Sequence, residues 1–239
     1  EVAKNITMLF KENKIKKKYL TIVQGKLEKR IYINLNNHVN LQKMITEFTK
    51  RGFRRNHNHM YIPSCTNCNE CISTRINIKK FYLSRSNKRN LKNNNDLFLI
   101  SNKKYTHDRF LLFQEYCSVR HSSGQMQNMT ENEFINFFHK SSNKTKIFDL
   151  INENNQLYGS ILLDELEDGF SAVYSFFNPK EKKRSLGKNI ILQTIRKLDE
   201  QKNKYLYLGF WVKESRTMNY KSLFNHVEYF KGGTWTENL

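Results

Sequence analysis

The sequence predicts an α+β protein, with a small N-terminal α+β domain that carries a cysteine cluster and a larger mixed domain after it. Three observations indicate this class. Helical periodicity is clear in segments that lie far apart, aromatic and β-branched runs of strand length fill the intervals, and three cysteines stand three residues apart in one short segment. With 239 residues, the chain has room for one compact domain or two small ones.

The first half of the chain predicts one helix and two extended segments. Leu41, Met44, Ile45 and Phe48 share one helical face, and Gly52 lies where a glycine commonly ends a helix. The extended runs are residues 53–62 and 75–81, and the basic residues 1–30 predict an exposed arm or edge segment.

A basic segment separates the two predicted domains. Residues 87–96 are rich in Lys, Arg and Asn, and Leu91 is their only apolar side chain, which predicts a linker or turn. We therefore place an N-terminal domain at residues 1–95 and a C-terminal domain at residues 96–239.

The second half predicts a helix pair followed by alternating strands and helices. Phe110, Phe113 and Cys117 lie on one helical face, and Thr130-x-x-Glu133 is a capping box at the start of the next helix. Strands are predicted at 146–152, 157–163, 170–177, 205–211 and 226–230, with a helix opened by Ser185 and a short helix at 218–224. This order, β-β-β-α-β-α-β, is that of the core of the N-acetyltransferase-like (GNAT) acyltransferases, which is an analogy at the level of the fold.

The charge balance predicts a polyanionic partner. The chain has 41 Lys and Arg against 22 Asp and Glu, a formal net charge of +19, and a field of this size attracts the phosphates of nucleic acids. No apolar run approaches the about 18–20 residues of a membrane-spanning helix, so we expect no membrane partner and a cytoplasmic location.

Two motifs offer polar chemistry. Cys65, Cys68 and Cys71 have metal-type spacing, but a zinc or iron–sulfur centre needs four ligands, and Cys117 is expected in the core. The loop Arg184-Ser-Leu-Gly187-Lys188-Asn189 lies where a GNAT enzyme grips a pyrophosphate with backbone N–H groups. Asn189 replaces the final small residue of the acetyltransferase pattern and lysines crowd the loop, so the acceptor end of a tRNA is an alternative occupant to acetyl-CoA.

Four arginines surround the first unit, and a guanidinium is well suited to bind a carboxylate through paired hydrogen bonds. We expect one of them to hold an acidic substrate. They are Arg54, Arg55, Arg75 and Arg85.

The order of several motifs resembles the arginyl-tRNA-protein transferase family. The N-terminal motifs are Gly52-Phe-Arg-Arg55, Tyr61-Ile-Pro63, Cys65-x-x-Cys68-x-x-Cys71, Thr74-Arg-Ile76 and Ser84-Arg-Ser-x-Lys-Arg89. The C-terminal motifs are Tyr116-x-x-x-Arg120, Tyr174-Ser-Phe-Phe-x-Pro179, Arg184-Ser-Leu-Gly187, Tyr205-Leu-Tyr-Leu-Gly209, Lys213 and Met218-Asn-Tyr-Lys221. The short length and the cysteine spacing are similar to the bacterial aspartate/glutamate leucyltransferase branch.

This resemblance implies an aminoacyltransferase that moves leucine from leucyl-tRNA to the α-amine of proteins beginning with Asp or Glu, which marks them for degradation in the N-end rule pathway. Family members carry a further cysteine near the start, and the matching stretch Tyr19–Gly25 has none. That cysteine helps to define the metal or iron–sulfur site proposed for the family, so this departure from the family leads us to expect no required cofactor. The resemblance leaves Cys65, Cys68 and Cys71 as the candidate ligands of zinc or an iron–sulfur cluster.

On this basis we assign roles to the motif residues. We expect Arg75 to bind the acidic side chain of the acceptor, with Arg54 or Arg85 assisting. Candidate hydrogen-bond donors or proton relays are Tyr174, Tyr207 and Tyr220. The tRNA is assigned to Arg184, Gly187, Lys188, Lys213 and Lys221. The rival functions are arginyl transfer to the same acceptors, acetyl transfer from acetyl-CoA, and a non-catalytic tRNA-binding module; the oligomeric state is left open.

Overall fold

The computed structural model contains two compact units. Its described residues are 18–23, 26–35, 40–66, 68–120, 125–141, 143–215 and 217–239. The first unit contains the described residues up to Asn77 together with 166–171 and 205–239, and the second contains 78–165 and 172–204. Each unit therefore combines segments that are distant along the chain. The domain boundary predicted near residue 95 stays a prediction.

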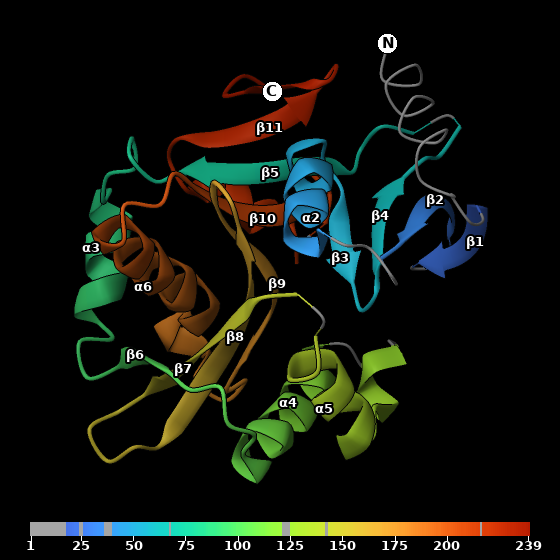
Figure 1. Cartoon of the computed structure of the whole chain (residues 1–239). Helices are drawn as coiled ribbons and strands as arrows, with labels where there is room; N and C mark the ends of the chain where they lie inside the picture. Colours follow the sequence, from blue (N-terminus) through green and yellow to red (C-terminus); the bar gives the residue numbers. More distant parts are fainter. Residues whose placement is uncertain are drawn as a thin grey trace. The chain divides into compact units, whose positions relative to one another are not determined.

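One part of the first unit is a four-stranded antiparallel sheet (Figure 1). Its strand order is β1-β2-β4-β3, so β1 is an edge strand, in line with the edge segment expected near the N-terminus. Residues 1–17 of that predicted arm lie outside the described residues. The strands are β1 (Lys18–Val23), β2 (Lys26–Asn34), β3 (Arg54–Asn56) and β4 (His59–Pro63).

A second group of strands brings the middle and the end of the chain together. β5 lies between β10 and β11 and is antiparallel to both, and β12 pairs with β11. The first residues of β9 run parallel to β10 as far as Ser171 opposite Tyr207, after which a bulge before Gly209 shifts β10 against β5. The bounds are β5 (Ile72–Asn77), β9 (Gly169–Phe177), β10 (Tyr205–Trp211), β11 (Val227–Lys231) and β12 (Thr234–Thr236).

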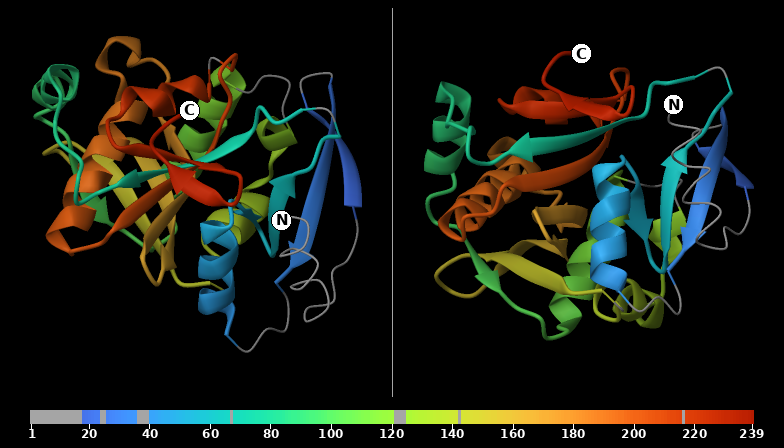
Figure 2. Two further views of the ribbon diagram at one scale, coloured as in Figure 1. Left: turned by 90° about the horizontal axis from the view of Figure 1, so that it is seen from above. Right: turned by 45° about the horizontal axis from the view of Figure 1, so that its top comes forward.

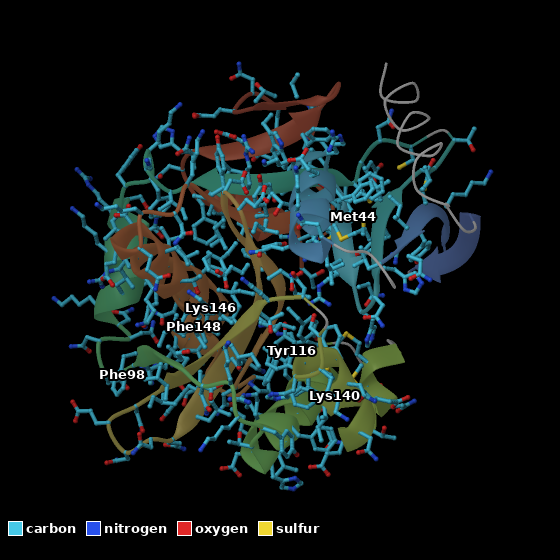
Figure 3. The ribbon with its side chains drawn as sticks, viewed as in Figure 1. Met44, Phe98, Tyr116, Lys140, Lys146 and Phe148 are labelled. Atoms are coloured by element: carbon cyan, nitrogen blue, oxygen red, sulfur yellow. The ribbon has the colours of Figure 1, made fainter. Side chains whose placement is uncertain are left out.

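Helix α2 (Leu41–Lys50) supplies the helical layer of the first unit. The Asn40 side chain accepts a hydrogen bond from the Lys43 amide, and Gly52 ends the helix with φ of 85°, which confirms the predicted helix and its terminal glycine. Met44 packs at the edge of the core (Figure 3). The core residues are Ile33, Leu35, Ile45, Phe48, Phe53, Met60, Leu166, Tyr205 and Tyr207.

The second unit places helices around the strands β6 to β9. The three predicted meander strands and the helix pair are present, and the capping box at Thr130 and Glu133 is complete. Cys117 is buried in the aromatic core, as predicted. The bounds are β6 (Phe98–Ser101), α4 (His107–Arg120), η1 (Gln125–Asn128), α5 (Glu131–Phe138), β7 (Thr145–Ile151), β8 (Leu157–Leu166), η2 (Lys182–Arg184) and α6 (Leu186–Glu200).

The prediction of a linker at residues 87–96 is wrong, because most of this segment forms helix α3 (Arg85–Lys92). The Ser84 hydroxyl caps the helix by accepting from the Asn87 amide, and the buried positions are asparagines rather than apolar residues. α3 lies beside α6 (Figures 1 and 2). A search for apolar periodicity could not detect a helix whose inner face is made of amides.

Three smaller expectations also need correction. Ser185 precedes α6 in a left-handed conformation, with φ and ψ of 50°, and its side chain makes no capping hydrogen bond. The short helix predicted at 218–224 is the 3₁₀ turn η3 (Asn219–Leu223). The strands β6 and β12 were not predicted, since neither reaches five residues. Within the described residues, no helix has both the length and the apolar character to cross a membrane.

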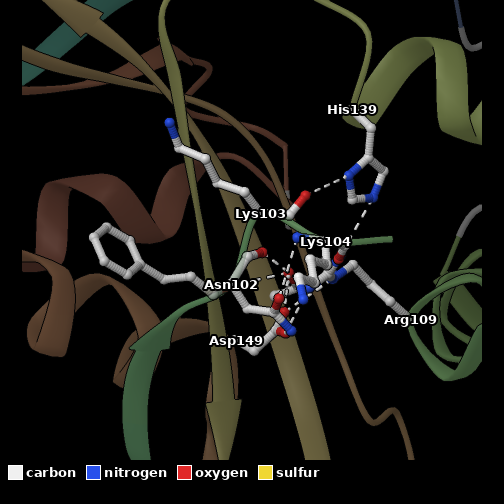
Figure 4. A network of polar contacts seen from close by, with 8 residues as sticks. Asn102, Lys103, Lys104, Arg109, His139 and Asp149 are labelled. Carbon is white, nitrogen blue, oxygen red and sulfur yellow. Dashed lines mark hydrogen bonds and ion pairs between the residues drawn. The ribbon is translucent and has the colours of Figure 1, made fainter. Parts of the chain in front are cut away.

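A buried ion pair holds α4 to β7 in the second unit (Figure 4). The Arg109 Nε and one terminal nitrogen donate to the two oxygens of Asp149 at 2.9 and 2.6 Å, and Arg109 is 0% exposed. The remaining donors reach the carbonyls of Lys104 and Asn102 and the ring of His139. This arginine is thus fully engaged inside the chain.

Candidate functional site

Arg75, which the sequence assigned to the acidic substrate, lies inside a buried network of the first unit. Its Nε donates to Glu228 at 2.6 Å and its NH1 donates to the Tyr207 hydroxyl at 3.2 Å. The guanidinium carbon lies 3.6 Å from the centroid of the Tyr205 ring and 4.4 Å from that of Trp235. A guanidinium held in this way by a carboxylate and two aromatic faces already has a counter-ion inside the chain. The assignment of Arg75 to the acidic substrate stays a prediction.

Two of the three tyrosines assigned as proton relays are also engaged in buried contacts. Tyr207 donates to Asp168 at 2.9 Å, and burial raises the pKa of its hydroxyl. The Tyr174 hydroxyl lies 3.8 Å from the Cys117 sulfur in the second unit, and burial raises its pKa as well. Both phenols therefore keep their protons at neutral pH, so they can donate a hydrogen bond but do not serve as bases.

Tyr220, the third tyrosine, belongs to a separate group of residues around the bulge of β10. Burial raises the pKa of its hydroxyl, and the nearby Arg54 guanidinium opposes that shift. Lys221 is 8% exposed, and its ammonium donates to the Phe210 carbonyl of β10. Burial and the Arg54 charge together lower the pKa of Lys221 to about 7. We call Arg54, Tyr220 and Lys221 the bulge cluster.

The backbone at Gly209 allows Arg54 to approach β10. Gly209 has φ of +81°, and a Cβ added there would lie 2.0 Å from the Arg54 NH1 atom. Any side chain at this position would therefore displace the guanidinium as well as strain the backbone. The glycine of the motif Tyr205-Leu-Tyr-Leu-Gly209 is explained by this contact.

The loop before α6 in the second unit is held by amide side chains. Asn90 and Asn94 donate to the Arg184 carbonyl at 3.2 and 3.0 Å, and the Arg184 Nε donates back to the Asn94 oxygen at 2.9 Å. Arg184 also pairs with Asp96, while Asn189, fully buried, donates to the Asn90 oxygen at 3.2 Å. The residue that departs from the acetyltransferase pattern, Asn189, thus helps to fix the loop to α3.

An aromatic group lies against the start of α6. A Cβ added to Gly187 would come within 2.7 Å of the Phe177 ring. The Tyr116 ring, labelled in Figure 3, lies 5.0 Å from that of Phe177, and the Arg120 guanidinium lies 5.7 Å from it. The motif residues Tyr116, Arg120 and Gly187 therefore meet around one phenylalanine.

Gly187→Ala should destabilise the second unit by about 1–3 kcal/mol, because the new methyl group overpacks the Phe177 contact. Urea unfolding followed by circular dichroism measures this change. Lys183→Ala, at an exposed neighbouring position, is the matched control and should leave the unfolding midpoint within experimental error. Equal midpoints for Gly187→Ala and the wild type would contradict the tight contact.

Basic side chains cover α3 and the turn that leads into α6. Arg85, Lys88, Arg89 and Lys92 are exposed on α3, as are Lys182 and Lys183 on η2. The Lys188 ammonium donates to the Ser86 hydroxyl at 2.9 Å, and burial, with a smaller effect of Arg89, lowers its pKa. We call these seven cations the basic surface.

The structure divides the residues predicted to bind tRNA. Arg184, Gly187 and Lys188 lie together in the second unit, at or next to the basic surface. Lys213 is exposed in the first unit, in the turn after β10, whereas Lys221 is buried there in the bulge cluster. Likewise, of the arginines assigned to the acceptor, Arg54 and Arg75 belong to the first unit and Arg85 to the second.

The cysteine segment gives no arrangement typical of a metal site in the described part of the chain. Cys68 and Cys71 are exposed, Cys65 is half-buried, and none of the three forms a disulfide. No group of three or more His, Cys, Asp or Glu side chains is gathered as metal ligands among the described residues. Metal binding by these thiols stays a prediction.

Comparison with known proteins identifies relatives over most of the chain. Residues 18–89 match the family model described as arginine-tRNA-protein transferase, N terminus, and residues 108–231 match the model described as its C terminus. An aspartate/glutamate leucyltransferase of Saccharophagus degradans is 37% identical over 195 residues, which cover 81% of this chain and 83% of the relative. One from Hahella chejuensis is 33% identical, covering 89% of this chain and 91% of the relative.

Similarity to solved structures is weaker. The structure of L-PGS from Bacillus licheniformis has a TM-score of 0.48 and 8% sequence identity, covering 90% of this chain and 80% of that chain.

Proposed function

The chain belongs to the arginine-tRNA-protein transferase family, which makes it an aminoacyltransferase, and we propose that it moves leucine from leucyl-tRNA to the N-terminal amine of proteins that begin with Asp or Glu. The observation that carries this proposal is the 33–37% identity to relatives named aspartate/glutamate leucyltransferase over more than four-fifths of both chains. We also propose that the reaction takes place in the cytoplasm.

The chemistry is the attack of an amine on an activated ester. The α-amino nitrogen of the acceptor bonds to the carbonyl carbon of the leucyl ester, the bond to the ribose oxygen of the tRNA breaks, and the amine proton passes to that oxygen. An α-amine with a pKa near 8 is partly neutral at pH 7, so the protein's main task is to orient the two substrates and to donate hydrogen bonds to the oxyanion. We assign no metal or other cofactor to this step.

We assign the tRNA to the basic surface of the second unit. Seven cations gather there on α3, η2 and the start of α6, and phosphate contacts supply much of the affinity of proteins for nucleic acids. Tyr116, Phe177 and Arg120 add aromatic and guanidinium faces of the kind on which unpaired bases stack. The single-stranded acceptor end of a tRNA offers both phosphates for such cations and unpaired bases for such stacking.

Lys88→Gln combined with Arg89→Gln should weaken tRNA binding. It should also flatten the slope of log K against log salt concentration by roughly 0.7–0.9 for each phosphate that the protein no longer neutralises. Filter binding at several salt concentrations measures both quantities. Lys140→Gln is the matched control, because this exposed lysine lies at the end of α5, away from α3 (Figure 3). An unchanged slope in the α3 variant would remove α3 from the tRNA site.

The proposed function is tested by supplying labelled leucyl-tRNA and arginyl-tRNA in parallel reactions. The acceptors are peptides that begin with Asp, Glu, Asn or Ala. We expect leucine on the Asp and Glu peptides alone. Arginine on the same peptides would assign the chain to arginyl transfer, and tRNA binding without any transfer would leave only a binding module.

A further inference from the structure

Lys221 is a buried cation whose hydrogen-bond partner is neutral. Its ammonium reaches the Phe210 carbonyl, and among the described residues it has no carboxylate partner. Two other buried cations of the chain, Arg75 and Arg109, each hold a carboxylate at 2.6 Å. A buried charge is normally paired in this way, because removal from water is costly without an opposite charge.

The nearest charged group makes the position of Lys221 still less favourable. The guanidinium of the half-buried Arg54 lies against Gly209, and the ammonium of the buried Lys221 reaches the carbonyl of the next residue, Phe210, so the two cations are neighbours at the bulge. The Arg54 charge accordingly contributes to the lowered pKa of Lys221. The approach of Arg54 is built into the backbone, since only glycine at position 209 leaves room for the guanidinium. Local costs of this kind are concentrated at functional sites, where a ligand offsets them.

We propose that Arg54 and Lys221 form the site that binds the side-chain carboxylate of the acceptor's N-terminal Asp or Glu, an inference that rests on the proposed function. A carboxylate offers two oxygens, which can accept from the guanidinium and from the ammonium at the same time. The Lys221 ammonium is too deeply placed for the surface-following phosphates of a polynucleotide, for which the second unit carries its own basic surface.

This site explains the selection of acidic over amide side chains. An N-terminal Asn or Gln has nearly the same shape as Asp or Glu but carries no charge, so it would leave the buried Lys221 ammonium without an anion. A binding site with buried charged groups discriminates against ligands that fail to pair them.

The site also gives acceptor binding a pH dependence. The carboxylate binds the charged form of Lys221, so binding weakens as the pH rises through the pKa of about 7. The titratable and charged groups around this position are Arg54 from β3, Tyr220 from η3, whose pKa is raised, and Tyr61 from β4, whose ring lies against that of Phe210. The raised pKa of Tyr220 keeps that phenol neutral where Lys221 titrates.

The test compares Lys221→Met, Lys221→Arg and Lys231→Met. Lys231 is an exposed lysine of the first unit and serves as the control for the loss of one positive charge. Steady-state leucine transfer gives KM and kcat for an Asp peptide, and filter binding gives the Kd for leucyl-tRNA. A thermal shift with the Asp peptide alone, against an Asn peptide, measures acceptor binding without catalysis.

For Lys221→Met we expect the KM for the Asp peptide to rise about 10- to 100-fold, the effect of losing a hydrogen bond to a charged group, while kcat and the tRNA Kd stay within threefold. Lys221→Arg should keep the preference for Asp over Asn. The Asp peptide should raise the melting temperature of the wild type, whereas the Asn peptide should not. The rise should be smaller at pH 8.5 than at pH 6.5. Neither peptide should raise the melting temperature of Lys221→Met.

Three results would overturn the inference. The first is an unchanged KM for the Asp peptide in Lys221→Met, and the second is an equal loss of affinity for leucyl-tRNA. The third is a decrease in kcat alone, which would assign Lys221 to proton transfer. The thermal shift needs no leucyl transfer, so a protein that transfers nothing but responds to the Asp peptide would refute the proposed function and leave the carboxylate site standing.

Discussion

Arg109→Met should lower the free energy of unfolding by about 3–5 kcal/mol, because it leaves Asp149 as a buried carboxylate without its cation. The pair is almost fully removed from water, with side-chain exposures of 0% for Arg109 and 4% for Asp149. The substitution also removes the donors for two loop carbonyls, those of Asn102 and Lys104, so the loop before α4 loses its support. Urea unfolding of the purified variant measures the loss.

The double variant Arg109→Met with Asp149→Leu separates the cost of an unpaired charge from the loss of packing. Replacing both partners removes the buried charge, so the double variant should be more stable than either single variant. Ser160 and Asn102, which bond to Asp149 at 2.8 and 2.9 Å, limit the recovery. A double variant no more stable than Arg109→Met would show that hydrogen bonding, rather than charge, dominates here.

The sequence predicted those elements whose buried face is apolar. Helix α2, the Phe110–Cys117 face of α4 and the capped start of α5 all follow from the spacing of apolar residues and from local capping chemistry. Helix α3 was missed because its buried positions are Asn87 and Asn90. The Asn90 amide, like that of Asn94 just after the helix, binds the Arg184 carbonyl, about 90 residues further along the chain, and this contact cannot be predicted from local sequence.

For the candidate site, too, the sequence predicted the types of residue but not the role of each one. The residue types were predictable, since arginines and lysines are the groups that bind carboxylates and phosphates. Their individual roles were not, because Arg75 finds its carboxylate 153 residues away and Lys221 is buried by tertiary packing. Charge in a sequence indicates the kind of ligand, and only burial and pairing indicate which cations remain available for it.

Arg75→Met should also lower the free energy of unfolding by about 3–5 kcal/mol, since it leaves Glu228 buried without its cation. Glu228 is 8% exposed, and its second oxygen has the Asn77 amide at 3.4 Å as a hydrogen-bond partner. The change further removes a guanidinium that lies against the rings of Tyr205 and Trp235. Urea unfolding again gives the magnitude.

Glu228→Gln distinguishes a structural role of Arg75 from the substrate-binding role first assigned to it. A carboxylate cannot itself attract an acidic acceptor, so any effect of Glu228→Gln on transfer must act through Arg75 and the network. If Arg75 is structural, both variants should reduce stability and should raise the KM for the Asp peptide much less than Lys221→Met does. The opposite result would be a higher KM for the Asp peptide in Arg75→Met, with an unchanged free energy of unfolding, and an unchanged KM in Glu228→Gln. That result would show that Arg75 binds the acceptor carboxylate. The comparison therefore decides which of Arg75 and Lys221, both buried cations of the first unit, has its anion inside the chain and which receives it from the substrate.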